Sequence, residues 1–152
     1  MSKGFEKDDP YFKAEQKKYG RAAPSRHYLA AWLKRHKKAV TLQQIIEKMG
    51  IQEADMQIAV NRRLNAMVRD AQICQSPEGY LSSQHLVTVK GVLTISADGE
   101  VAVLPDDDDA LVYMPGADLP WLIEGDSVEA VINRYSATRQ YAVFKRCINC
   151  LL

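Results

Sequence analysis

The sequence predicts an α+β fold in which a helical half precedes a β-rich half. Apolar residues recur at helical spacing as far as Asp70 and alternate along strands from Leu86 onward. Charge follows the same division. The first 75 residues carry 15 Lys and Arg against 8 Asp and Glu, whereas the rest of the chain carries 5 against 11. The first half therefore has a net charge of +7 and the second a net charge of −6, which sum to the overall +1. The basic half suggests a polyanionic partner.

Length and composition limit the classes of protein that fit. A chain of 152 residues makes one ordinary domain or two small ones, and 47% hydrophobic with 26% charged residues is a globular composition. No apolar run approaches the ~20 residues that span a bilayer, and the charged first 20 residues lack a signal-peptide core. Three cysteines are an odd number without a disulfide framework. We therefore expect a cytoplasmic protein without disulfides.

Three helices are expected in the basic half, after a charged and loosely attached arm over residues 1–23. Ser25 is a good N-cap for the first helix, because its hydroxyl can accept from free backbone N–H groups. Thr41 caps a short second helix that ends at Gly50. The third helix runs from about Glu53 to Asp70. Residues at helical spacing mark the buried side of the first helix: Tyr28, Leu29, Trp32, Leu33 and His36.

A short hairpin follows the third helix. Two brief segments, Gln72–Gln75 and Tyr80–Ser82, flank a Pro77-Glu78-Gly79 turn. Three helices and a hairpin in this order are the pattern of a winged helix-turn-helix, with the third helix as the recognition helix and the hairpin as the wing. We expect this domain over residues 24–84.

The β-rich half is expected to form five short strands over residues 85–152. Asp98-Gly99 is a strong hairpin signal between the first two strands. Five strands with one longer irregular connection predict a small closed barrel of the OB type. The expected strands lie within these segments: Leu86–Ser96, Glu100–Leu104, Ala110–Met114, Ser127–Arg134 and Gln140–Ile148.

Several motifs resemble one known family. The run Arg62-Arg63-Leu64-Asn65-Ala66-Met67-Val68-Arg69-Asp70-Ala71-Gln72 resembles the helix-to-wing segment of the ribonuclease R enzymes, of the exoribonuclease II family. Shorter motifs before it resemble the beginning of the same enzymes: Asp9-Pro10-Tyr11, Lys18-Tyr19 and Pro24-Ser25-Arg26. Others after it are similar to their first cold-shock domain: Val89-Lys90-Gly91-Val92, Asp98-Gly99, Asp107–Tyr113 and Glu124-Gly125-Asp126-Ser127-Val128.

This resemblance implies a winged helix-turn-helix, three helices plus a β-wing, followed by an OB/cold-shock-like barrel that together bind RNA. Ribonuclease R continues into a second cold-shock domain, a catalytic domain with a magnesium-binding aspartate cluster, and an S1 domain, none of which fits here. The resemblance thus implies the accessory part without the exonuclease, as a fragment or a paralogue. Two departures stand out. Ala71 occupies a position where the family prefers glycine, and Glu100–Leu104 lacks the base-stacking aromatic residues of cold-shock strands.

Basic side chains are the candidates for nucleic-acid contact. Arg62 and Arg69 lie seven residues apart on one face of the third helix, with Asn65 between them. Arg63 lies nearer the boundary between this face and the apolar face. Arginines there can bind phosphates, and Asn65 can reach a base or sugar. A second group of cations ends the first helix, where the alternative is to complement the helix dipole: Lys34, Arg35, Lys37 and Lys38. Lys90 is a further candidate in the barrel, and a solvated surface is the alternative for all of them.

No residues indicate catalysis, a metal or a cofactor. Asp106–Asp109 are consecutive and cannot all converge on one ion, so we expect a solvated loop, with mimicry of phosphate as the alternative. Cys147 and Cys150 make only half of a zinc site, and we expect Cys147 in the core. Trp121 is expected to plug the barrel, or else to anchor a partner. The three histidines are isolated.

The sequence thus predicts an RNA-binding accessory module that is not an enzyme and contacts phosphates through its basic helices. The first alternative is a protein-interaction module that regulates a full-length exoribonuclease or acts on the ribosome, which the acidic barrel favours. The second is a winged-helix DNA-binding regulator. Duplex DNA is the weaker partner because no dimerisation helix is evident. No membrane partner is expected.

Overall fold

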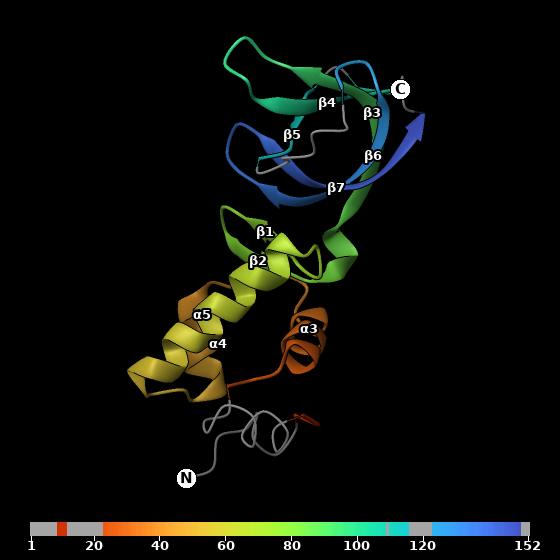
Figure 1. Cartoon of the computed structure of the whole chain (residues 1–152). Coiled ribbons are helices and arrows are strands. Elements are labelled where there is room, and N and C mark those ends of the chain that lie inside the picture. Colours follow the sequence, from red (N-terminus) through yellow and green to blue (C-terminus); the bar gives the residue numbers. More distant parts are fainter. Residues whose placement is uncertain (1–8, 12–22, 109, 116–122, 150–152) are drawn as a thin grey trace. The chain divides into compact units, whose positions relative to one another are not determined.

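The computed structural model describes residues 9–11, 23–108, 110–115 and 123–149. The chain forms two compact units, Met1–His85 and Leu86–Leu152 (Figure 1). The described part of the first unit holds three helices and a two-stranded hairpin, and that of the second holds a five-stranded barrel. The fold is therefore α+β, as predicted. No described helix is long and apolar enough to cross a membrane.

Helices α3 and α4 begin at residues whose side chains cap them, as the sequence predicts. Helix α3 (Arg26–Lys34) starts after Ser25, whose Oγ accepts a hydrogen bond from the Tyr28 N–H at 3.1 Å. Helix α4 (Leu42–Met49) starts with a capping box, in which the side chains of Thr41 and Gln44 each accept from the other's backbone N–H. Gly50 ends α4 in the left-handed conformation. Helix α5 (Ala54–Arg69) is the longest of the three.

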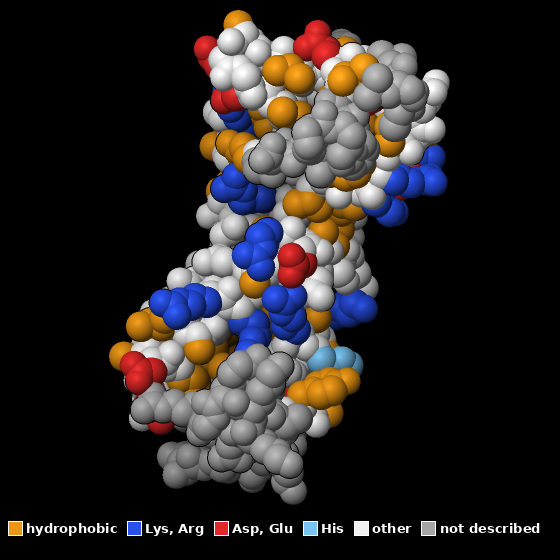
Figure 2. Space-filling model, in the orientation of Figure 1, with side chains coloured by type: hydrophobic (Ala, Val, Ile, Leu, Met, Phe, Trp, Pro, Cys, Tyr) orange, Lys and Arg blue, Asp and Glu red, His pale blue; other side chains and the backbone are white. Residues whose placement is uncertain are grey.

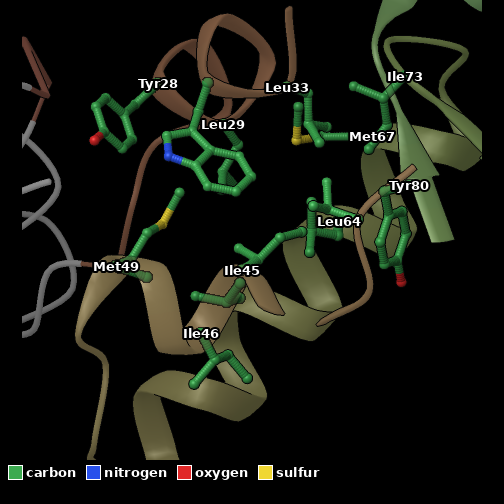
Figure 3. Packing of buried hydrophobic residues seen from close by; sticks show 14 of the residues in the cluster. Tyr28, Leu29, Leu33, Ile45, Ile46, Met49, Leu64, Met67, Ile73 and Tyr80 are labelled. Carbon is green, nitrogen blue, oxygen red and sulfur yellow. The ribbon is translucent and has the colours of Figure 1, made fainter. Parts of the chain in front are cut away.

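The three helices pack around one apolar core (Figure 3). Helix α5 buries the face that carries Val60, Leu64 and Met67, and its opposite face stays exposed. This division holds one side of α5 against the core and leaves the other side, with Arg62, Asn65, Arg69 and the apolar Ile58, open to solvent. The side chains labelled in Figure 3 come from the three helices, from the hairpin and from the residue just before it: Tyr28, Leu29, Leu33, Ile45, Ile46, Met49, Leu64, Met67, Ile73 and Tyr80.

The hairpin consists of β1 (Cys74–Ser76) and β2 (Gly79–Leu81) and is followed by a short 3-10 turn, η1 (Ser83–His85). It is tied to the segment between α3 and α4 by a bridge of two hydrogen bonds. Val40 N donates to Tyr80 O at 3.0 Å, and Tyr80 N donates to Val40 O at 2.7 Å. A Cβ at Gly79 would overlap the Val40 carbonyl, so this close approach requires glycine.

Part of the predicted arm is firmly attached. Asp9 is only 5% exposed, and its carboxylate accepts from the backbone N–H and the hydroxyl of Ser25, each at 2.6 Å, and from Tyr11 N at 3.0 Å. The ring of Tyr11 meets His27 edge-on at 5.4 Å. The expectation of a loose arm is therefore wrong for residues 9–11, and most of the rest of the arm lies outside the described residues.

The second unit is a closed barrel with an OB-like fold. Strand β3 pairs antiparallel with β4 and β6, β4 pairs antiparallel with β5, and β6 pairs antiparallel with β7. Parallel pairing of β5 with β7 completes the ring. The strand bounds are β3 (Val87–Ile95), β4 (Val101–Pro105), β5 (Val112–Tyr113), β6 (Ser127–Tyr135) and β7 (Gln140–Asn149).

The interior of the barrel is filled by aliphatic side chains and one methionine. Its core consists of Leu93, Val103, Val112, Met114, Val128, Ala130, Ile132 and Ala142. Gly91 lies where a Cβ would overlap the Leu104 carbonyl, so β3 and β4 approach each other closely at this glycine. The third strand is shorter than expected, since only Val112 and Tyr113 of the segment Ala110–Met114 pair with neighbouring strands.

The structure also tests the expectations for the cysteines and for the acidic loop. Cys147 is half-buried rather than in the core, so the expectation for this residue is wrong. Cys74 is a buried free thiol whose pKa burial raises. Asp106–Asp108 are exposed, as expected for a solvated loop. Asp109, Trp121 and Cys150 lie outside the described residues.

Replacing Asp9 by alanine should destabilise the helical unit. The variant leaves the N–H and hydroxyl of the buried Ser25 without their carboxylate partner, which we expect to cost about 1–3 kcal/mol of unfolding free energy. Urea unfolding followed by circular dichroism at 222 nm measures this change. Glu78→Ala, which removes an exposed carboxylate of the same unit, is the matched control and should unfold as wild type.

Replacing Ala71 by glycine should stabilise the helical unit. Ala71 follows α5 with a φ of +56°, and the next N–H, of Gln72, donates to Met67 O at 2.8 Å. A Cβ is unfavourable in this left-handed conformation, so Ala71→Gly should raise the unfolding free energy by roughly 0.5–1 kcal/mol. Ala66→Gly inside α5 should lower it by a similar amount. Equal destabilisation by both substitutions in urea would contradict this account.

Candidate nucleic-acid interface

The exposed face of α5 brings three of the sequence-predicted residues together. Arg62, Asn65 and Arg69 are all exposed and lie on the helix side opposite the core. Figure 2 shows Lys and Arg side chains gathered over this part of the helical unit. The row spans two helical turns, ~10 Å, which is enough to contact successive phosphates of a nucleic-acid strand.

Asn65 is held in place by the hairpin. The Tyr80 hydroxyl donates to Asn65 Oδ1 at 2.9 Å, and burial raises the pKa of Tyr80, so this hydroxyl remains a donor. The amide nitrogen of Asn65 lies 3.5 Å from Asn61 Oδ1. The carboxamide therefore has a fixed orientation, with its oxygen toward the hairpin. A side chain fixed in this way loses little freedom when it binds a sugar or base.

An arginine that sequence reasoning missed extends the basic surface. Arg26 donates from one nitrogen to Asp70 Oδ2 and to Gln72 Oε1, both at 2.9 Å, and Arg69 Nε lies 3.6 Å from Asp70 Oδ1. The hydrogen bond from Arg26 lowers the pKa of Asp70. Two arginines thus share one carboxylate at the end of α5 and retain a net positive charge. Arg26 and Asp70 are 44 residues apart, so only the fold reveals the contact.

Arg63 differs from its neighbour Arg62. Its guanidinium is half-buried and donates to Pro24 O at 2.8 Å and, more weakly, to Ala23 O at 3.5 Å. Those carbonyls belong to the segment that leads into α3. Arg63 therefore ties α5 to the start of α3, and this contact uses donors that a phosphate contact would need.

The remaining candidates lie at two other places. Lys34, Arg35, Lys37 and Lys38 are all exposed at the end of α3, and within the described residues no hydrogen bond or ion pair links them to the α5 face. Lys90 is exposed on β3 and lines a barrel pocket of about 720 Å³ that also contains Asp106, Asp107 and Asp108. These carboxylates make the surroundings of Lys90 unfavourable for a phosphate.

The chemistry of this surface is that of binding. It offers guanidinium groups and one oriented amide, and the described residues contain no group of three or more His, Cys, Asp or Glu side chains that could hold a metal ion. Exposed arginines on a helix, together with an OB-like barrel, fit a nucleic-acid-binding module.

Comparison with known proteins agrees with this class. The chain is 29% identical over 121 residues to ribonuclease R of Acidithiobacillus ferrooxidans, and 28% identical over 142 residues to that of Buchnera aphidicola subsp. Acyrthosiphon pisum. It is 26% identical over 123 residues to ribonuclease R of Escherichia coli strain K12. These matches cover 79%, 92% and 80% of the chain but only 27%, 19% and 15% of the relatives. The chain therefore resembles a partial region of ribonuclease R. No protein-family model matches it.

Replacing Arg62 and Arg63 one at a time by alanine should have different effects on the unfolding free energy. Arg63→Ala removes hydrogen bonds to the backbone carbonyls of the buried Ala23 and Pro24 and should lower the unfolding free energy by about 1–2 kcal/mol. Arg62→Ala removes an exposed side chain and should change it by less than about 0.5 kcal/mol. Urea unfolding at 222 nm measures both, and equal effects would show that the Arg63 contact contributes nothing.

Proposed function

We propose that this chain is a non-catalytic RNA-binding accessory module, which contacts RNA phosphates through the exposed face of α5. The observation that carries this proposal is the row of Arg62, Asn65 and Arg69 on the exposed face of α5. The opposite face of this helix packs in the core. The resemblance to part of ribonuclease R, an enzyme named for its action on RNA, supports RNA as the polyanion. Arg26 extends the surface beyond the end of the helix.

We further propose that residues 24–84 form a winged helix-turn-helix, with α5 as the recognition helix and the β1–β2 hairpin as the wing. The order of three helices and a hairpin supports this assignment, as does the Val40–Tyr80 bridge, which adds a third short strand segment beside the hairpin. We propose residues 85–152, which contain the barrel, as the second domain. The hydrogen bond from Tyr80 to Asn65 then couples the wing to the recognition helix.

The Arg62→Ala/Arg69→Ala variant should bind RNA more weakly. Loss of two phosphate contacts should reduce affinity about tenfold at moderate salt and reduce the slope of log affinity against log salt by about 1–2. The measurement is a fluorescence titration of the full chain with single-stranded RNA, duplex RNA and duplex DNA at several salt concentrations. Lys48→Ala, which removes an exposed cation at the end of α4, is the control for simple loss of charge.

The outcomes distinguish the candidate functions. Unchanged affinity and salt slope in the double variant would exclude α5 as the contact surface. Tighter binding to duplex DNA than to either RNA would replace the proposal with a DNA-binding regulator. No binding to any of the three at moderate salt would overturn nucleic-acid binding.

A protein-interaction module is the second candidate, and one feature of the barrel favours it. Val92 and Leu104 are directly paired across β3 and β4, and they are 40% and 43% exposed. A pair of exposed branched side chains on the outside of a barrel suits a protein contact. Under this alternative, the chain binds a full-length exoribonuclease or the ribosome, and Leu104→Ser weakens that complex without affecting RNA affinity.

A further inference from the structure

A β-bulge in β7 brings two cations to one carboxylate on the outside of the barrel. Ala130 pairs with Phe144, whereas the preceding residue of β6, Glu129, pairs with Arg146, so Lys145 is an extra residue of β7. Two residues of β7 therefore oppose one residue of β6, which is the arrangement of a bulge. As a result, the side chains of Lys145 and Arg146 both reach Glu129.

Glu129 holds the two cations in place. Its neighbours Val128 and Ala130 belong to the barrel core, so alternation along β6 turns Glu129 outward, yet its side chain is only 5% exposed. Lys145 Nζ lies 3.1 Å from Oε1, and Nε and Nη2 of Arg146 lie 3.1 and 3.0 Å from Oε2. The hydrogen bonds from Lys145 and Arg146 lower the pKa of Glu129, so the carboxylate stays ionised. Both cations remain exposed to solvent.

Lys90 adds a third positive charge beside this group. It is exposed on β3 and is the direct cross-strand neighbour of Glu129 on the side away from β7. Among the described residues, no carboxylate other than Glu129 forms an ion pair with Lys90, Lys145 or Arg146. Three cations against one carboxylate leave a net positive charge on a barrel sequence that is acidic as a whole.

Exposed apolar side chains lie next to these cations. Val92 follows Lys90 by two residues on β3, and Ile148 follows Arg146 by two residues on β7. Ser127 of β6 lies between the two strands at this level, since it pairs with Val92 and with Asn149. An apolar row thus runs beside the cationic row across three strands. We call this surface the β6 face and define it by the exposed residues Lys90, Val92, Lys145, Arg146 and Ile148.

We propose that the β6 face is a docking surface for an acidic, amphipathic segment of a partner protein. The carboxylates of this segment pair with the cations, and its apolar side chains cover Val92 and Ile148. Charge complementarity makes the partner acidic. Because Glu129 already orients Lys145 and Arg146, these side chains lose little freedom on binding. The inference goes beyond the proposed RNA contact and does not depend on it, since all of its residues lie in the barrel.

Two features favour a protein segment over RNA at this surface. Asp106, Asp107 and Asp108 line a pocket together with Lys90, and their carboxylates repel a continuous row of phosphates. A peptide can place single carboxylates at the cations and none beside the acidic loop. Exposed branched aliphatic side chains next to the cations are also typical of protein contacts.

Selection from a library of random peptides tests the β6 face with a defined probe. Peptides displayed on phage are selected on the immobilised full chain, and the enriched sequences should combine Asp or Glu with apolar residues. Each enriched peptide is then titrated with the full chain by fluorescence polarisation. Lys145→Gln/Arg146→Gln should weaken peptide binding about tenfold and leave RNA affinity within about twofold of wild type. Arg134→Gln, which removes an exposed cation elsewhere on β6, is the matched control and should bind the peptides as wild type.

A second variant applies if loss of both cations from the buried Glu129 unfolds the barrel. Lys90→Gln/Ile148→Ser keeps the ion pairs of Glu129 and should weaken peptide binding about fivefold.

The same titrations separate failure of this inference from failure of the proposed function. No enrichment, enriched peptides without acidic residues, or unchanged peptide affinity in the folded variant overturns the docking surface and leaves the RNA contact of α5 unaffected. Equal weakening by Arg134→Gln overturns it as well, because the effect is then one of total charge. If Lys145→Gln/Arg146→Gln weakens RNA binding as much as Arg62→Ala/Arg69→Ala does, the β6 face is an RNA contact and the inference is wrong.

Discussion

The parallel pairing of β5 with β7 is the constraint on which the barrel depends. It consists of only two residue pairs, Val112 with Gln140 and Tyr113 with Tyr141, yet it joins strands that are far apart in sequence and closes the ring. Closure removes the free sheet edges and encloses the core around Val112. The same pairing turns Tyr113 outward beside Tyr141. One short ladder therefore forms both the hydrophobic interior and the aromatic exterior.

The helical unit depends on a similar set of sparse long-range contacts. The Val40–Tyr80 bridge fixes the hairpin, and the Tyr80 hydroxyl then orients Asn65 on α5. Buried Asp9 and half-buried Arg63 fix the start of α3 from two sides, by accepting from Ser25 and by donating to the Pro24 carbonyl. Of the exposed arginines of α5, Arg69 contacts only the neighbouring Asp70, which is itself exposed. Affinity for a polyanion and stability of the unit are thus assigned to different residues of the same helix.

The sequence predicted the features that local chemistry controls. Ser25, Thr41 and Gly50 mark helix ends because caps satisfy backbone groups within a few residues, and the structure confirms all three. The α+β class and the OB-like barrel followed from the change in apolar spacing. The contacts of Asp9 with Ser25, of Arg26 with Asp70 and of Tyr113 with Tyr141 could not be predicted, because they join residues 16, 44 and 28 positions apart. Spacing along the chain contains no signal for pairs that only the tertiary fold creates.

The proposed contact surface on α5 attracts nucleic acid without distinguishing one kind of strand from another. Guanidinium contacts to phosphates are available on any nucleic-acid strand, paired or unpaired, so the α5 face supplies attraction with little selectivity. The opposite charges of the two halves fit this proposal, because the arginines of the proposed contact all lie on the basic half.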